Sequence, residues 1–401
     1  MNLLENIASF DATITKRLRL KGITSEFQAY RIPLKYLRYN VKNDRIATFI
    51  TQYIDEVGEL PEETHEINNV LEKFIIDSNP DAFKKTKNNI QAIFQSEVAV
   101  IMSNGVVIDG NRRFTALRQL SKESGKSEFA YLEAVILPRD QYDEKDIKRL
   151  ELNLQHAIES KIDYNPIERL VGIYRDLIQE GHPFSIKEYA EETQIKVPKV
   201  KEEIAIATLL VEYLKYINQP EKFHIARTQK IDGPLREIYK ILKSKKIDAD
   251  DEEDVKEYLF ANILSLEGDI TRKIRDLKPV MEKKESREKI IDEAEDFLDD
   301  INDNLADSIV EEVASKTGIV NINHNIRENL TNITEKYVDA NKLANAKNQP
   351  IEALKKSLER VEEVDKDAVQ RFNSNMSKEL IIYIDKIEAE LKSLRELANV
   401  K

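Results

Sequence analysis

The segment "VVIDGNRRFTAL" at residues 106–117 places an Asp, a Gly, an Asn and two adjacent arginines between an apolar run and a helical pattern. A second apolar run precedes it, and Asn-Gly between two short apolar runs is a strong signal for a β-hairpin. After Gly110 the apolar residues recur at helical spacing. The segment therefore predicts strands at 98–102 and 106–108, then a tight turn and a helix.

Residues Gly110 to Arg113 have the parts of a phosphate-binding loop. Glycine lets the backbone approach a ligand closely, amides at the start of the following helix favour an anion, and two arginines add planar donors. A short basic pair more often lies in solvent or pairs with carboxylates, and Asp109 alone is typical of a turn or a helix cap. The tetrapeptide leaves both interpretations open.

The composition predicts a helix-rich protein of two or three domains. Of the 401 residues, 34% are charged and 41% hydrophobic, and only 10 are glycine, which argues against a mostly β architecture. The net charge of -12 would repel a polyanion, so any contact with DNA requires a local basic surface.

The sequence has no cysteine, which excludes disulfides, thiolate metal sites and cysteine nucleophiles and fits a reducing compartment. The N-terminus lacks a basic head followed by an apolar core, and no stretch approaches the roughly 18 apolar residues of a membrane span. We expect a cytoplasmic protein without membrane contact.

Two regions of different pattern make up the first part of the chain. Residues 1–28 form an N-terminal extension that the pattern does not assign. Residues 29–160 contain a short strand and loop over 29–46, a helical stretch over 47–94, the hairpin, a further strand at 129–137 and another helix. This mixture predicts an α+β domain.

Residues 161–245 have the pattern of an all-α domain of short helices. Two of these helices, 185–194 and 197–217, are separated by little more than "IK", which is helix-turn-helix spacing. From 246 to 401 the pattern is charged and helical, with a heptad seam from Leu380 to Ala398 and a comparable run that includes Ala294, Phe297, Ile301, Leu305 and Ile309. A helical hairpin within one chain and a dimeric coiled coil explain these seams about equally well.

Several familiar kinds of site have no support in the sequence. The five histidines are scattered, and none of them forms a helical metal pair such as H-E-x-x-H. The G-x-S-x-G nucleophile turn, the Walker lysine loop and G-x-G-x-x-G are also missing. The sequence therefore offers no hydrolase, P-loop or dinucleotide-binding signature.

The order strand, "DGNRR", helix, strand, helix and helix-turn-helix resembles the ParB family of chromosome- and plasmid-partition proteins, whose N-terminal domain has the ParB/sulfiredoxin fold. The family's G-E-R-R-x-x-A motif is similar to Gly110, Arg112, Arg113 and Ala116, with Asn111 in place of the glutamate. The resemblance extends over about residues 29–216 and depends on the order of several short motifs.

Three further segments carry the resemblance. "LRYNVKNDRI" is similar to the family's R-P-N-P-x-Q-P-R loop, where Arg38, Asn40 and Arg45 match and Asn43 stands at the Gln position. "LNLQ" resembles E-N-x-Q through Asn153 and Gln155, with Leu152 in place of the glutamate. "NPIE" at 165–168 matches the segment that opens the DNA-binding helices.

The resemblance implies one nucleotide pocket that binds CTP with magnesium and closes two subunits into a clamp on DNA. Arg112 and Arg113 would hold phosphates with the amides after Gly110, while Asn43 and Arg45 would close the pocket. Asn153 would contact the metal or a phosphate. The expected nucleotide-binding residues are Asn43, Arg45, Asp109, Gly110, Asn111, Arg112, Arg113 and Asn153, with Asn153 also the expected magnesium contact.

Two departures from the family pattern affect the expected chemistry. Asn111 and Leu152 stand where the family has acids that would order magnesium or the attacking water, so we expect nucleotide binding rather than hydrolysis and do not assign the base. Sulfiredoxin activity is excluded because it needs a cysteine where Asn111 stands. A nuclease would need a carboxylate pair near the arginines, and here Asp109 offers one carboxylate.

The second helix of the helix-turn-helix gives mixed signals for DNA binding. Lys196, Lys199 and Lys201 are the candidate DNA contacts, but Glu202 and Glu203 follow at once. A module retained for packing explains the segment as well as DNA reading does.

The sequence predicts a ParB-like, nucleotide-gated DNA-binding protein in partition, mobile-element maintenance or phage defence. Its partners would be a nucleoside triphosphate with magnesium, DNA, a second copy of the chain and, in a partition role, an ATPase. One alternative is an NTP-dependent enzyme, either a kinase or a nuclease, with CTPase-like hydrolysis also open. Another is an interaction protein with an inactive pocket.

Overall fold

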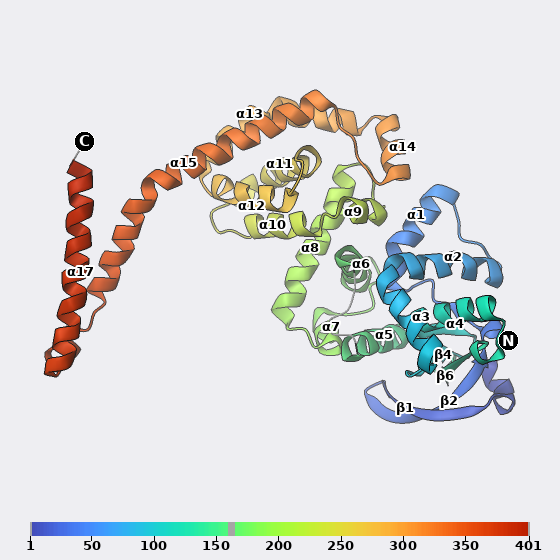
Figure 1. Cartoon of the computed structure of the whole chain (residues 1–401). Helices are drawn as coiled ribbons and strands as arrows, with labels where there is room; N and C mark the ends of the chain where they lie inside the picture. Colours follow the sequence, from blue (N-terminus) through green and yellow to red (C-terminus); the bar gives the residue numbers. More distant parts are fainter. Residues whose placement is uncertain (1, 159–164, 400–401) are drawn as a thin grey trace. The chain divides into compact units, whose positions relative to one another are not determined.

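The computed structural model describes residues 2–158 and 165–399. The chain divides into one compact unit that ends at Val338 and a second that begins at Asp339. Within the described ranges, no helix is long and apolar enough to cross a membrane. The expected α+β region followed by a largely helical region with long C-terminal helices is confirmed (Figure 1).

A six-stranded mixed sheet lies at the centre of the α+β region. The strands are β1 (Ala12–Leu20), β2 (Ile23–Pro33), β3 (Arg38–Tyr39), β4 (Ala99–Met102), β5 (Val106–Asp109) and β6 (Tyr131–Leu137). Their order is β1-β2-β6-β4-β5-β3. β4 pairs in parallel with β6, and β3 in parallel with β5, while the other neighbours are antiparallel.

The predicted hairpin is present as β4 and β5. Gly105 closes its turn with a positive φ of 85°, and its amide donates to the carbonyl of Met102 at 2.8 Å. A side chain at this position would lie 2.2 Å from the carbonyl oxygen of Tyr36, so only glycine fits the turn. The Asn-Gly signal was therefore a correct guide to this part of the sheet.

The N-terminal residues that the sequence left unassigned belong to the sheet. β1 and β2 form a long antiparallel hairpin that turns at Lys21 and Gly22, both with positive φ. Only Ala29–Pro33 of β2 pairs with β6, so the earlier residues of β2 pair with β1 alone. The division expected after residue 28 therefore falls within a strand.

Helices cover both faces of the sheet. They are α1 (Ala47–Val57), α2 (Thr64–Ser78), α3 (Pro80–Ile93), α4 (Asn111–Ser124) and α5 (Glu144–Ile158). Successive residues of β4 point to opposite faces: Ala99 and Ile101 pack in the core with α2, α3 and α4, whereas Val100 and Met102 pack in the core with α5. α4 therefore lies in the same layer as α2 and α3, and α5 covers the opposite face.

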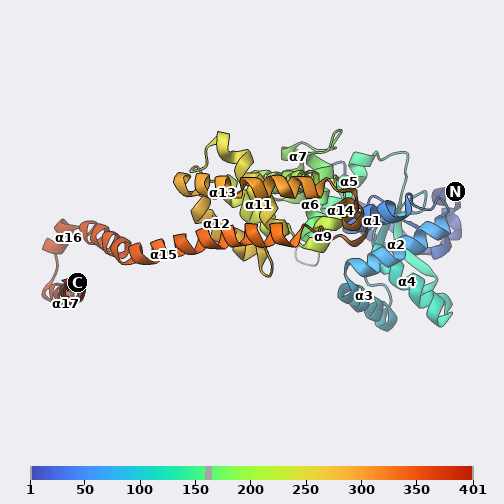
Figure 2. The same ribbon diagram turned by 90° about the horizontal axis from the view of Figure 1, so that it is seen from above.

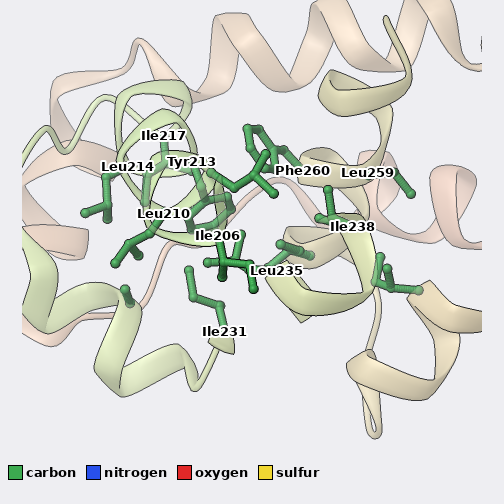
Figure 3. Packing of buried hydrophobic residues seen from close by; sticks show 14 of the residues in the cluster. Ile206, Leu210, Tyr213, Leu214, Ile217, Ile231, Leu235, Ile238, Leu259 and Phe260 are labelled. Atoms are coloured by element: carbon green, nitrogen blue, oxygen red, sulfur yellow. The ribbon is translucent and has the colours of Figure 1, made fainter. Parts of the chain in front are cut away.

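The helical region of the first unit has one continuous core. Its helices are α6 (Pro166–Leu177), α7 (Ile186–Thr193), α8 (Val197–Tyr216), α9 (Phe223–Gln229), α10 (Asp232–Leu242), α11 (Glu252–Ser265), α12 (Ile270–Met281), α13 (Lys284–Leu305), α14 (Ser308–Thr317) and the first part of α15 (His324–Glu362). Tyr213 of α8, Leu235 of α10 and Phe260 of α11 meet in this core (Figure 3). The core therefore crosses the division expected at 245/246.

The first predicted apolar seam is part of the same core. Ala294, Ile301 and Leu305 of α13 are buried, and Phe297 packs against them, while the side chain of Ile309 lies outside the described part of the chain. α13 runs beside the first part of α15, where Lys336 pairs with Glu293 at 2.7 Å (Figure 2). The apolar residues of this seam are therefore buried by other helices of the same chain.

The second unit consists of the rest of α15, α16 (Lys366–Gln370) and α17 (Ser374–Asn399). None of the residues of α17 is buried. Ile384, Ile387, Leu391 and Leu394, four of the six residues of the predicted heptad seam, are each more than 40% exposed. This unit therefore presents an uncovered apolar face.

Candidate functional site

Gly110 determines the geometry of the loop between β5 and α4. Its φ of 97° and ψ of 21° are left-handed, and α4 begins at the next residue. A side chain here would lie 2.8 Å from the Cβ of Ala99 and 3.0 Å from Nη2 of Arg113. The loop therefore needs glycine both for its backbone conformation and for the space beside β4.

A second segment, residues 38–46, lies against this loop because β3 pairs with β5. After β3 the chain makes the 3₁₀ turn η3 (Asp44–Ile46), which Asn43 caps by accepting from the amide of Arg45 at 3.1 Å. Asn43 itself is buried. The short strand β3 thus brings a loop that precedes Gly110 by more than sixty residues to the start of α4.

The first hollow is a small cavity of about 30 Å³ between these two loops and α5. Six of the eight predicted nucleotide-binding residues line it: Asn43, Arg45, Asp109, Gly110, Asn111 and Arg112. The side-chain oxygen of Asn111 is buried there without a hydrogen-bond partner among the described residues. Because buried polar atoms are normally paired, this oxygen is a ready acceptor for a bound group.

Arg113 and Asn153 do not line the first hollow. The guanidinium of Arg113 pairs with Asp109 at 3.1 Å, beside Lys16, whose pKa is lowered by burial. The amide of Asn153 donates to Glu192 of α7 at 2.9 Å. Gln155, which also carried the resemblance, has a side chain outside the described part of the chain.

Glu151 is the residue of the first hollow that the sequence motifs missed. It lines the cavity, whereas Leu152, its neighbour at the family's acidic position, packs in the helical core. Burial raises the pKa of Glu151 to about 8, although Lys148 opposes the shift. The comparison with E-N-x-Q looked for an acid only at position 152. The glutamate one residue earlier, at position 151, was the signal in the sequence that could have identified this residue.

A buried ion cluster lies behind the first hollow. Lys148 of α5 pairs with Asp44 of η3 at 2.5 Å and with Asp176 of α6 at 3.5 Å. Burial raises the pKa of Asp176 to about 7 despite the nearby cation. Gly172 of α6 makes room for Asp44, since a side chain there would lie 3.2 Å from its carboxylate. The cluster connects the pocket loop to the helical region.

The second hollow, of about 300 Å³, adjoins the first through Arg45 and Ser78, which line both. Its other walls are Phe49, Asp77, Asn165, Glu168 and Arg227. The Arg227 guanidinium lies 3.6 Å from the ring centroid of Phe49. Ligand-binding cavities usually have about 300–1,000 Å³, so this hollow has the size that the first one lacks.

The "NPIE" segment forms one wall of the second hollow. Asn165 caps α6 by accepting from the amide of Ile167 at 2.9 Å. Glu168 is buried and accepts hydrogen bonds from the amide and hydroxyl of Thr48. Burial raises the pKa of Glu168 to about 7. This segment therefore contacts the pocket side of the molecule as well as opening the helical region.

No group of three or more metal-ligating side chains occurs within residues 2–158 and 165–399. Asp109 and Glu151 line the first hollow together, so two carboxylates stand where the sequence offered one. Asn153, the expected magnesium contact, lies away from them.

The expected helix-turn-helix spacing is present in α7 and α8, which pack against each other. Lys199 pairs with Glu202 at 2.6 Å and with Glu203 at 3.1 Å, while Lys196 and Lys201 are exposed. Although burial opposes it, hydrogen bonds from Arg236 and Arg169 hold the pKa of Glu203 at about 2. The start of α8 therefore presents the cations of Lys196 and Lys201, whereas Lys199 is paired with two carboxylates.

Comparison with known proteins gave no match: no family model, curated protein or solved structure is similar to this chain.

Proposed function

We propose that the chain binds a nucleoside triphosphate with magnesium in the two adjoining hollows. One observation carries the proposal: the Asn43–Arg45 loop, the Asp109–Arg112 loop and Glu151 line a single cavity although the chain separates them widely. Two arginines, a helix start and an unpartnered acceptor are the groups that a phosphate chain with its metal requires.

The two hollows divide the ligand between them in this proposal. Arg112 and the amides at the start of α4 hold phosphates in the first hollow, and Asp109, Glu151 and the Asn111 oxygen face the hydrated magnesium. The larger second hollow receives the rest of the nucleotide, with Arg45 between the two parts. Because the first hollow has only about 30 Å³, the loops separate when the ligand enters.

Nucleotide binding would act on DNA binding through α6 and the ion cluster. Arg45 lines both hollows, and η3 is joined to α5 and α6 through Lys148. The resemblance to ParB proteins supports a nucleotide-gated DNA-binding protein of the cytoplasm, with CTP as the first nucleotide to test. A role in partition, mobile-element maintenance or phage defence, with a partner ATPase in the partition case, follows from that resemblance alone.

The test is a titration of the full chain with each of ATP, CTP, GTP and UTP in the presence of magnesium. Melting temperature and isothermal calorimetry are the readouts, followed by an electrophoretic shift of duplex DNA with and without the nucleotide that binds. One nucleotide should raise the melting temperature and change the DNA affinity. If none of the four moves the melting temperature, the proposal is wrong and an interaction protein with an inactive pocket becomes the better description.

Asp109 and Glu151 support one second candidate, an enzyme that uses the same pocket. A pair of carboxyl groups beside arginines, once a metal displaces the proton that burial keeps on Glu151, is the arrangement that metal-assisted phosphoryl transfer or DNA cleavage needs. Phosphate release and nicking of a supercoiled plasmid, measured with the nucleotide that binds, separate this enzyme from a protein that only binds.

A further inference from the structure

The β1–β2 hairpin carries a concentration of positive charge outside the pocket. Residues 12–31 contain five cationic side chains and one carboxylate in a chain whose net charge is -12. Along β1, Arg17 and Arg19 are exposed while Leu18 and Leu20 are buried, so the strand presents its arginines on one face. Same-face side chains of a strand are about 6.8 Å apart, roughly twice the 3.4 Å rise per nucleotide of DNA.

This cationic face reaches the turn between α7 and α8. A groove of about 310 Å³, the hairpin groove, is lined by Arg17, Arg19, Thr24, Asn153, Glu192 and Gln194, together with three leucines. Gln194 has a positive φ and begins the turn that leads to the exposed Lys196. The hairpin and the start of α8 therefore border one surface.

The acidic groups at this surface are largely engaged by other side chains. Glu192 pairs with Arg149 at 2.8 Å and accepts from Asn153. Glu26 pairs with Arg17 at 2.9 Å, but both side chains are more than half exposed, and such pairs are weak. Glu191 lines the neighbouring hollow with Lys21 and is exposed. The arginines are thus available to a stronger polyanion.

We propose that the β1–β2 hairpin and the α7–α8 turn together grip the backbone of duplex DNA, with Arg17 and Arg19 on phosphates and Lys196 beside them. The DNA part rests on the proposed function, but the residues are different from those of the pocket. Duplex DNA is favoured because a two-stranded ribbon and the start of a helix are both elements that enter its major groove. The part of β2 before Ala29 pairs only with β1, so no third strand covers this stretch of the ribbon, and its arginine face points away from the leucines that pack on α5.

The test measures anisotropy of a labelled mixed-sequence 30-base-pair duplex against the full chain over a series of salt concentrations. Each lost phosphate contact lowers the slope of log K against log salt by about 0.9, so Arg17→Ala with Arg19→Ala should lower it by about 1.8. The matched control, Lys84→Ala with Lys85→Ala, removes the same charge from exposed positions of α3 and should leave the slope unchanged. Arg17→Lys with Arg19→Lys should retain the wild-type slope.

Three results would overturn the inference: an unchanged slope in the arginine variant, an equal loss in the α3 control, or tighter binding of duplex RNA or anionic vesicles than of DNA. A nucleotide titration of the arginine variant tests the proposed nucleotide binding separately from the inferred DNA contact. Because Arg17 and Arg19 lie outside both hollows, the nucleotide-induced rise in melting temperature should persist in it. That persistence also shows that the variant is folded.

Discussion

The side-chain amide of Asn40 donates a 2.6 Å hydrogen bond to the carboxylate of Glu151, and both groups are buried. The bond joins the loop before η3 to α5 at the wall of the first hollow. A ligand that separates the two loops has to disturb this bond or carry α5 with it. Lys148, one turn earlier on α5, pairs with Asp44 and Asp176, so the hollow is joined to α6 through this cluster, and in the proposed function movement at the hollow would reach α6.

The two adjacent arginines should differ in their effect on nucleotide binding. Arg112→Ala is expected to abolish the nucleotide-induced rise in melting temperature, because its side chain lines the first hollow. Arg113→Ala, the matched control, should retain most of that rise because the side chain of Arg113 does not line the hollow and only pairs with Asp109, which does. Calorimetric titration of both variants checks this, and equal losses would contradict the assignment.

Stability should fall as the pH rises from 5.5 to 8.5. Burial raises the pKa of Glu151 to about 8 in the folded chain, so the proton is held more tightly there than in the unfolded chain. The stabilisation is therefore complete below about pH 4.5 and is lost as the pH rises toward 8. Asp176 and Glu168, whose pKa values burial raises to about 7, act with the same sign.

Glu151→Gln should reduce this pH dependence by at most about 1.4 kcal/mol per pH unit, as measured by urea unfolding at several pH values. Glu144→Gln is the matched control on the same helix, because Glu144 is exposed and hydrogen bonding from Lys42 lowers its pKa. An identical pH profile in wild type and Glu151→Gln would show that Glu151 is ionised in the folded chain.

Loss of the cation in the buried cluster should be far more destabilising than loss of a surface lysine. Lys148→Ala leaves Asp44 and Asp176 buried without their partner and is expected to cost about 3 kcal/mol of unfolding free energy. Lys42→Ala breaks only the exposed pair with Glu144 and should cost less than about 1 kcal/mol. Chemical unfolding measures both, and similar costs would mean that the cluster is not buried in solution.

Substitution of Gly110 should lower the free energy of unfolding more than substitution of Gly58, a glycine with a similar φ. Gly58→Ala imposes strain at a φ of 101° with no heavy atom within 4 Å of the added carbon, which costs about 1–3 kcal/mol. Gly110→Ala adds the overlap with Ala99 and should cost at least about 1 kcal/mol more. Thermal unfolding compares the two variants; equal costs would argue against the close approach of the loop to β4.

The apolar face of α17 should hold two copies of the chain together. Ile384→Glu with Leu391→Glu places charges on that face and is expected to convert a dimer to a monomer in light scattering. Lys386→Glu with Ser393→Glu, on the other side of the helix, serves as the control. A monomeric wild-type chain would refute the predicted homodimer.

Local signals predicted the part of the sheet nearest the pocket. Asn104 and Gly105 fix a tight turn by their own backbone preferences, and the helical spacing after Gly110 is also local, so β4, β5 and the start of α4 were predictable. β1 was not, because its leucines become a buried face only when β2 and α5 pack against them. α5, which buries these leucines, lies more than a hundred residues further along the chain and gives no local signal.

The sequence predicted only part of the site, and the reason is geometric. Adjacent helix residues point about 100° apart, and here the side chain of Arg112 lines the first hollow while that of Arg113 pairs with Asp109 and does not line it. The same geometry separates Glu151 from Asn153 on α5, two residues apart on different sides of the helix. A motif written as a string of letters does not show which face each residue takes, and that face depends on the packing of α4 and α5.

The order of strands in the sheet has a consequence for contacts between copies of the chain. Its two edges are β1 and β3, and an exposed edge offers unpaired backbone groups on which another chain could add a strand. β3 has only two residues, too few to serve as a template, while β1 has nine and is exposed to that risk. The arginines of β1 would repel the arginines of a second copy of the same strand. The positive charge that we propose to bind DNA therefore also opposes aggregation through this edge.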